Sequence, residues 1–201
     1  MSVIGSNILA GAAGQGGGYV IEESLRFNSS QSSYLSWTPA TAGNRKTWTW
    51  SGWVKRGNLD AAQYLFFAYN ANSDTGFFRI EFNSTNTIRV RGWATTYIET
   101  SAVYRDPSAW YHVVLVADTT QSQTSATASD SRIRLYINGE QLTAFGSSSM
   151  PSQNTDLPIN NNIGHTISSN VGYASGAYFD GYLAEVNFID GQALTPSSFG
   201  D

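Results

Sequence analysis

The chain has 201 residues, of which 41% are hydrophobic and 13% aromatic, enough apolar material for the core of one sizeable domain. A formal net charge of −4 and only 11 Lys and Arg residues argue against a nucleic-acid-binding protein, because phosphate recognition needs a concentrated positive surface. Cysteine is absent, which excludes disulfides and thiolate metal sites, so stability must come from packing of the aromatic side chains.

The first 18 residues are rich in Gly, Ala and Ser and carry no charged side chain. They are too poor in large side chains to bury a core, so we predict an extended N-terminal arm at 1–18 and one domain at 19–201. A disordered tail is one interpretation. In the other, the arm docks into a neighbouring subunit through its apolar side chains, which are Val3, Ile4, Ile8 and Leu9.

Membrane insertion is not expected. No apolar run approaches the roughly 20 residues that a transmembrane helix needs. No basic residue precedes Arg26, so an ordinary secretory signal is not expected either.

From Tyr19 onward, apolar and polar residues alternate with period 2 between turn residues, which predicts β-strands. In the strand at 48–55, Trp48 and Trp50 share one side, and Trp53 takes the other. One of these sides must face away from the core between two sheets. Trp53 is then either covered by a loop or a neighbouring subunit, or it forms a sugar-binding platform with Trp93 and Tyr97.

The segment 78–91 predicts a hairpin with a charged outer face. Its apolar residues alternate with charged ones, and a polar turn lies at 83–86. The arginines on this face are candidates for binding an anionic glycan, and they are Arg79, Arg89 and Arg91. In the alternative interpretation, Glu81 pairs with one of them and the charges serve solubility and block edge pairing.

The strand at 110–117 is apolar on both faces and should therefore be central in its sheet. Alternation at 132–137 followed by Asn138-Gly139 predicts a hairpin with a type I′ turn, because both positions of that turn need positive φ.

Near the end of the chain, the inward face is predicted to hold Tyr182, Ala184, Val186 and Phe188. Thr195-Pro196 can start a single helical turn after that strand. The spacing fits about ten to fourteen strands in two sheets, so the predicted fold class is all-β, an antiparallel two-sheet sandwich.

The order of these motifs along the chain is characteristic of a known fold, and the motifs are SLRF, WTWSGWVKR, W-x-H-V at 110–113, LYING and FDGYLAEVNFIDGQAL. Residues 24–199 resemble the concanavalin A-like, laminin-G-like jelly roll of the lectin/glucanase fold. Within that group, AGNRKTWTWSGWVKRGNL, YRDPSAWYHVVLVADTTQ and FDGYLAEVNFIDGQALTPSSFG are most similar to lectin-like domains of tailed-bacteriophage virion proteins. A leader of the IGSN-LAGAAG type often precedes those domains.

The resemblance implies a non-enzymatic phage virion surface protein, either a capsid decoration subunit or a short head or tail fibre. Such a protein is made in the host cytoplasm, resides on the virion surface and is anchored by its arm. Its partners would be other virion proteins, of the capsid or the tail, and copies of itself in a homo-oligomer. The alternative is a lectin-like tail protein that binds a host-surface glycan, and a weaker alternative is a glycan hydrolase.

Catalysis is not expected. Glycosidases of the resembled fold carry a Glu-x-Asp-x-x-Glu or Glu-x-Asp-x-Glu strand, which does not occur in this chain. The nearest pair is Asp180 and Glu185, and their odd spacing on a strand sends them to opposite faces. A Ser-His-Asp site would need His112 or His165, and neither sits beside a G-x-S-x-G elbow. We expect His112 to be a hydrogen-bonded residue of the sandwich.

No cofactor is expected. A Ca²⁺ at the rim is the alternative that the resemblance leaves open, since Ca²⁺ takes six to eight oxygen ligands. No loop motif for Ca²⁺ is recognisable among the rim donors, which are Asp74, Asp118, Asp130, Asp156 and the run Asn160 to Asn162.

Overall fold

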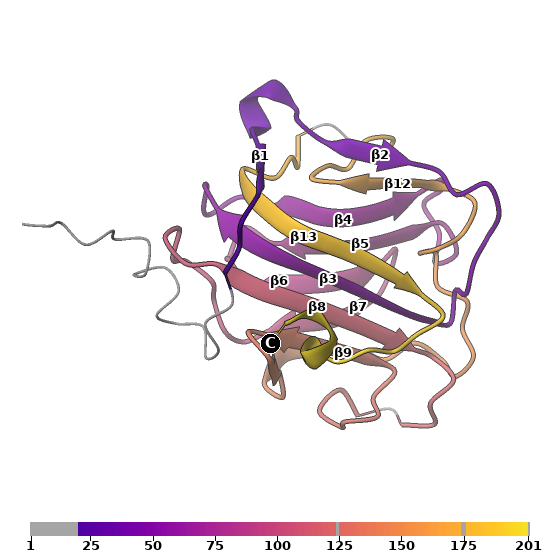
Figure 1. The fold of residues 1–201 in the computed structure, drawn as a ribbon. Coiled ribbons are helices and arrows are strands. Elements are labelled where there is room, and N and C mark those ends of the chain that lie inside the picture. Colours follow the sequence, from indigo (N-terminus) through magenta and orange to yellow (C-terminus); the bar gives the residue numbers. More distant parts are fainter. Residues whose placement is uncertain (1–19, 124, 174–175, 201) are drawn as a thin grey trace, which may run out of the picture.

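The computed structural model describes residues 20–123, 125–173 and 176–200. They form two antiparallel sheets packed face to face, with thirteen strands and two short 3-10 turns (Figure 1). The predicted all-β jelly-roll sandwich is confirmed. The arm residues Val3, Ile4, Ile8 and Leu9 lie outside the described residues. Among the residues that are described, no helix is long and apolar enough to cross a bilayer.

One sheet has six strands. In spatial order they are β1 (Leu25–Phe27), β13 (Gly181–Asp190), β3 (Thr47–Arg56), β8 (Tyr111–Asp118), β9 (Ile133–Ile137) and β10 (Glu140–Gln141). Strand β8 lies between β3 and β9 and is buried on both faces, as its sequence predicts.

The other sheet has seven strands. In spatial order they are β11 (Phe145–Ser148), β7 (Thr96–Thr100), β6 (Ile88–Gly92), β5 (Phe77–Phe82), β4 (Gln63–Tyr69), β12 (Gly164–Ile167) and β2 (Leu35–Trp37). The two turns are η2 (Ser29–Gln31) and η3 (Pro196–Phe199), and η3 begins after Thr195 as predicted.

Large aromatic side chains hold the two sheets together. The ring of Trp48 meets Phe78 edge to face with centroids 5.5 Å apart, and Trp50 lies 6.2 Å from Phe66. Each pair joins β3 of one sheet to a strand of the other, so these rings form the layer between the sheets. Aromatic pairs of this kind contribute roughly 0.5–1.5 kcal/mol beyond the burial of their area.

The C-terminal turn covers the outer face of the six-stranded sheet. Phe199 of η3 packs against a second cluster of buried side chains, Val114, Val116 and Tyr136. This explains how β8 can be apolar on its outer face as well as on its inner face.

Both predicted hairpins are present. Asn138 and Gly139 have φ of 51° and 83°, the positive pair that a type I′ turn requires, and they join β9 to β10. Strands β5 and β6 pair with Glu81 opposite Arg89 and Arg79 opposite Arg91.

The predicted inward face of β13 is partly wrong. A bulge between Ala184 and Asn187 contains Glu185 at φ 48°, and it shifts the alternation by one residue. Before the bulge, Leu183 is the core residue at 2% exposure, whereas Tyr182 is 40% exposed and Ala184 lies opposite Trp53. After the bulge, Val186 and Phe188 do pack against the core as predicted.

Gly181, at the start of β13, allows a test of this packing. Its φ is +149°, and a Cβ there would lie 2.2 Å from the carbonyl oxygen of Lys55. Gly181→Ala should therefore lower the free energy of unfolding by roughly 1–3 kcal/mol in urea titrations. The matched control is Gly146→Ala in β11, whose added Cβ would meet nothing closer than 3.8 Å. Equal stability of the two variants would contradict the described backbone.

Candidate functional site

The outer face of the seven-stranded sheet carries a row of charged side chains from β5, β6 and β7. We define the arginine face as Arg79, Glu81, Arg89, Arg91 and Glu99. Their order follows from strand register, which places Arg79 opposite Arg91 and sets Arg89 between Glu81 and Glu99. Three positive side chains and two negative ones therefore share one side of the sheet.

Glu81 is the centre of the arginine face. It is fully buried, and its Oε1 lies 2.5 Å from Arg89 Nε and 3.1 Å from Arg79 Nη2. One carboxylate oxygen thus serves two guanidinium groups. Because a buried charged group is costly unless it is paired, these contacts offset the loss of solvent around Glu81 and Arg79.

Arg79 is also held by aromatic rings. Its guanidinium donates to the hydroxyl of Tyr64 and lies 4.8 Å from the Tyr64 ring centre and 5.3 Å from that of Phe77. Burial lowers the pKa of Arg79, while Glu81 and Tyr64 oppose that shift. Burial also raises the pKa of Tyr64 to about 12, with Arg79 acting against it. At neutral pH Tyr64 is therefore an uncharged hydrogen-bonding group.

Unlike the other two arginines, Arg91 has no carboxylate partner among the described residues. It is half-buried, and its Nη2 donates to the carbonyl oxygen of Trp93 at 3.4 Å. Its buried Nε has no acceptor among the described residues. The bonds described for the nearby Glu99 go to other residues, since its Oε1 accepts from Asn83 at 2.7 Å and Thr87 at 3.1 Å. Because Arg91 as a whole is only half-buried and its bond to Trp93 is long, part of its guanidinium remains able to donate to an incoming oxygen.

Two aromatic rings border the arginines. The rings of Trp93 and Tyr173 are 6.0 Å apart and nearly perpendicular, and both contact Phe77 beneath them. Tyr173 comes from the segment that follows β12, which is tied to β4 where Tyr64 N donates to the carbonyl of Ala177 at 3.1 Å. Tyr173 was not singled out from the sequence. Its only signal is a large ring within a small-residue stretch, NVGYASGA.

The structure brings together four of the six residues predicted to bind a ligand, Arg79, Arg89, Arg91 and Trp93. Their ligand-binding role remains a prediction. The predicted platform of Trp53, Trp93 and Tyr97 is not formed, because its members lie in three different places.

Trp53 lies on the outer face of the other sheet, is only 1% exposed and stacks on His112 with ring centres 4.5 Å apart. This agrees with the covered interpretation. Tyr97 lies between the sheets and stacks on Phe78, and burial raises its pKa to about 12. A bulge between β6 and β7 turns Tyr97 inward beside Ile98.

The histidines do not form an accessible nucleophilic site. Ser51 Oγ lies 2.8 Å from His112 Nε2, but both residues are 1% exposed, so a substrate cannot reach that hydroxyl. His112 is thus the hydrogen-bonded sandwich residue that was expected. The backbone N–H of Asn160 donates to His165 Nε2, which leaves Nδ1 to donate to the carbonyl of Ile163. Burial lowers the pKa of His165 and favours this neutral form.

Two of the carboxylates considered from the sequence have structural partners. Asp180 accepts from Arg26 and Ser29, and Asp118 accepts from Thr120 and Gln121. At the rim, Asn160 donates to Asp190 at 2.6 Å. Within the described ranges, no three acidic or histidine side chains gather in a way that could hold a metal ion.

Comparisons with known proteins agree on the fold. Residues 28–198 match the concanavalin A-like lectin/glucanases superfamily. No curated protein shows significant similarity to the chain.

Three solved structures illustrate the likeness. A native heptameric SAP-like pentraxin from Limulus polyphemus is 16% identical, with a TM-score of 0.55 over 83% of this chain and 73% of the other. The family 40 carbohydrate-binding module of the Ruminococcus gnavus IT-sialidase, bound to α2,3-sialyllactose, is 14% identical, with a TM-score of 0.56 over 89% and 95%.

The third is domain 4 of an extracellular arabinanase from Geobacillus stearothermophilus, in complex with arabinotriose. It is 19% identical, with a TM-score of 0.51 over 81% of this chain and 68% of the other. At these identities the three likenesses show a shared fold and nothing further.

The shared carboxylate of Glu81 can be tested by Glu81→Gln. The substitution leaves Arg79 buried without its counter-charge, so the free energy of unfolding should fall by roughly 3–5 kcal/mol. Urea titration followed by tryptophan fluorescence measures the change. Glu140→Gln is the matched control, since Glu140 is exposed in β10 and should alter stability by less than about 0.5 kcal/mol. A Glu81→Gln protein as stable as this control would refute the described network.

Proposed function

The chain belongs to the concanavalin A-like lectin/glucanases superfamily, and on that premise we propose that it is a non-enzymatic protein that binds carbohydrate on its arginine face. The observation that carries the proposal is the placement of the half-buried Arg91 opposite Arg79, whose guanidinium lies over Phe77, the ring that Trp93 and Tyr173 both contact. Arginine recognises carboxylate oxygens through paired donors, and an aromatic ring offers an apolar surface to a sugar ring.

The charge of the arginine face favours one class of glycan. Arg79, Arg89 and Arg91 outnumber Glu81 and Glu99 on a protein whose formal net charge is −4. A locally positive surface on an acidic protein favours a glycan that carries carboxylates. The Ruminococcus gnavus module that shares the fold is bound to α2,3-sialyllactose, a glycan of this class. That likeness is support by analogy, because the sequences are only 14% identical.

A binding role also suits the other side chains that could do chemistry. Ser51 and His112 are buried beyond the reach of a polymer substrate. Asp180 is engaged with Arg26 and Ser29. On the described part of the arginine face, Glu81 is paired with two arginines and Glu99 accepts from Asn83 and Thr87, so the face can hold a glycan but offers no free pair of carboxylates to cleave it.

Glycan arrays with sialylated, uronate-containing and neutral oligosaccharides test the glycan proposal. We expect binding to acidic members, and a loss of at least about tenfold in affinity on Arg91→Ala or Trp93→Ala. Matched controls are Arg105→Ala and Tyr182→Ala, an exposed arginine and an exposed tyrosine away from the arginine face. Both controls should bind like the unaltered chain. An array without any acidic-glycan signal, or equal losses in all four variants, would remove the proposal.

We further propose that the protein acts on the surface of a tailed-phage particle, as a capsid decoration subunit or a short head or tail fibre. The support is the similarity of the segments AGNRKTWTWSGWVKRGNL and FDGYLAEVNFIDGQALTPSSFG to virion lectin-like domains, together with the apolar arm. In this setting the arm residues Val3, Ile4, Ile8 and Leu9 anchor the protein to capsid or tail proteins or to further copies of itself. The arginine face then remains free to meet host glycans.

The particle proposal predicts that deletion of residues 2–18 abolishes incorporation into virions while the domain stays folded, because the apolar anchor is lost. Quantitative immunoblots of purified particles measure occupancy, and circular dichroism of the truncated protein controls for folding. Immunogold electron microscopy of unaltered particles then separates heads from tails. Normal occupancy of the truncated protein, or intact particles that carry no label, would overturn the proposal.

A further inference from the structure

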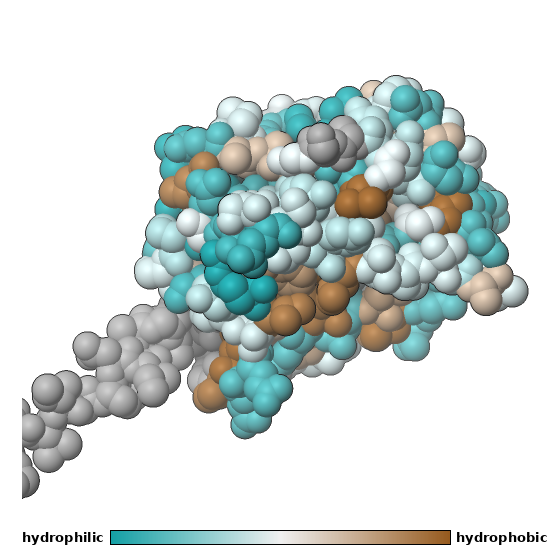
Figure 2. Space-filling model, turned by 90° about the horizontal axis from the view of Figure 1, so that it is seen from above, coloured by the Kyte–Doolittle hydropathy of each residue, from teal (hydrophilic) through white to brown (hydrophobic). Residues whose placement is uncertain are grey.

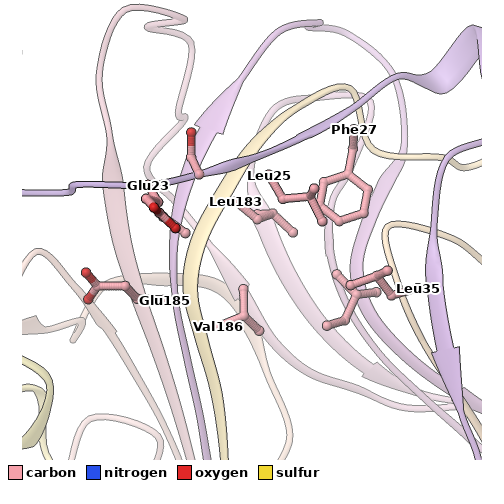
Figure 3. Close-up of a pocket in the computed structure, with 10 residues that line it drawn as sticks. Glu23, Leu25, Phe27, Leu35, Leu183, Glu185 and Val186 are labelled. Carbon is pink, nitrogen blue, oxygen red and sulfur yellow. The ribbon is translucent and has the colours of Figure 1, made fainter.

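The sandwich is open along one edge, and an apolar groove lies there. The groove has a volume of about 360 Å³, and the apolar residues that line it include Leu25, Phe27, Leu35, Leu183 and Val186. Figure 3 shows the apolar side chains from β1, β2 and β13 around one space, with Glu23 and Glu185 toward one end. This site is separate from the arginine face, since none of its residues belongs to β5, β6 or β7.

The groove exists because both sheets end there in very short strands. Strand β1 is the edge of one sheet and β2 is the edge of the other, and each has only three residues. Leu25 and Leu35 consequently remain 50% and 48% exposed. Figure 2 looks down on this side and shows an apolar patch between polar regions. Two edge strands also present unpaired backbone N–H and C=O groups to an incoming extended segment.

We propose that this groove binds residues Val3–Leu9 of the same chain. That segment has no charged side chain and contains two apolar pairs, Val3-Ile4 and Ile8-Leu9. In an extended segment, side chains four residues apart point to the same side, so Ile4 and Ile8 can enter the groove together. Their burial would also cover Leu25 and Leu35, and each Å² of apolar surface removed from water contributes roughly 25 cal/mol.

The connecting segment has the length and composition to allow this. Ten residues, 10–19, separate Leu9 from Val20, and a chain of that length spans up to about 33 Å. The described chain starts at Val20 and already lines the groove at Glu23. The glycine-rich run at 14–18 lets the chain reverse direction. Tethering also raises the effective concentration of the segment to roughly millimolar, which favours the chain's own groove over that of another copy.

Charge argues against two other occupants. An anionic lipid would bring its carboxylate or phosphate toward Glu23 and Glu185, which have the same sign. A sugar would need hydrogen-bonding groups in the floor, whereas the floor is formed by Leu25, Phe27 and Leu183. An uncharged apolar peptide fits both the floor and the rim.

The inference uses the same arm as the particle proposal but does not depend on its outcome. A segment that fits its own groove also fits the identical groove of a neighbouring copy, and exchange of identical elements between subunits costs little free energy. Docking in the free chain would then hold the arm until assembly offers a neighbouring groove.

Introduced cysteines can test the docking in the full chain, because the natural sequence contains no cysteine. In the double variant Ser6→Cys, Ser24→Cys, one thiol lies in the docking segment and the other lines the groove. A disulfide forms only when the two Cα atoms come within about 7 Å. The matched control pairs Ser6→Cys with Ser84→Cys, an exposed position in the turn between β5 and β6.

We expect oxidation of the dilute protein to yield an intramolecular disulfide severalfold faster in the groove pair than in the control pair. Non-reducing gels and mass spectrometry of peptides measure this rate. Equal rates in the two pairs would overturn the proposal, and so would disulfide-linked dimers as the main product, which would place another copy's segment in the groove.

A second comparison keeps the test independent of cysteine geometry. Leu35→Asp, introduced into the groove pair, should abolish the rate advantage by placing a charge in the apolar lining of the groove. Val103→Asp, at an equally exposed apolar residue outside the groove (49% against 48%), should leave that advantage intact. An unchanged rate in the Leu35→Asp protein would overturn the proposal. Neither result bears on the glycan arrays or on particle incorporation, so the failure of one proposal is distinguishable from that of another.

Discussion

Burial of β3 on both faces is the constraint on which the rest of the structure depends. Residues Trp48 to Val54 are all buried, so this strand needs a packed layer on each side. The seven-stranded sheet supplies one layer, where Trp48 meets Phe78 and Trp50 meets Phe66. On the other side, Trp53 stacks on His112, and Phe199 of the C-terminal turn lies against the same histidine. The outer face of β3 is therefore covered by its neighbours.

The outer face of the seven-stranded sheet, in contrast, carries the charged residues of the arginine face. A single carboxylate oxygen of Glu81 pairs with both Arg79 and Arg89, which stabilises Arg79 inside the surface layer. Arg91 donates instead to the carbonyl oxygen of Trp93. Because Arg79 and Arg91 are direct cross-strand neighbours of like charge, an additional negative group at this point would relieve their repulsion. The same geometry that makes the face costly to form thus makes it receptive to an anionic ligand.

The two surfaces that we assign to binding arise where the sandwich is incompletely covered. The arginine face is built on strands β5 to β7 in the middle of one sheet, whereas the groove lies where β1 and β2 leave both sheets open at one edge. One surface is charged and aromatic and the other is aliphatic, so they select chemically different partners. Proteins that share a superfamily fold have varied roles, so the fold does not determine which partner binds. The side chains on these two surfaces determine it.

Local alternation in the sequence determined the strands and the β5–β6 and β9–β10 hairpins. It also determined the central position of β8 and the charged row of Arg79, Arg89 and Arg91. These features follow from the sequence because the direction of a side chain in a strand alternates from one residue to the next along the chain. Only the tertiary structure decided the rest. The bulge at Glu185 reversed the faces of Tyr182 and Leu183, and the bulge before Ile98 sent Tyr97 into the core. Tyr173 reached the arginines, and Leu25 and Leu35 formed a groove, through contacts between residues far apart in the chain. Period-2 patterning holds no information on such contacts, because it records which side of a strand a residue takes and not which strand or loop lies against it.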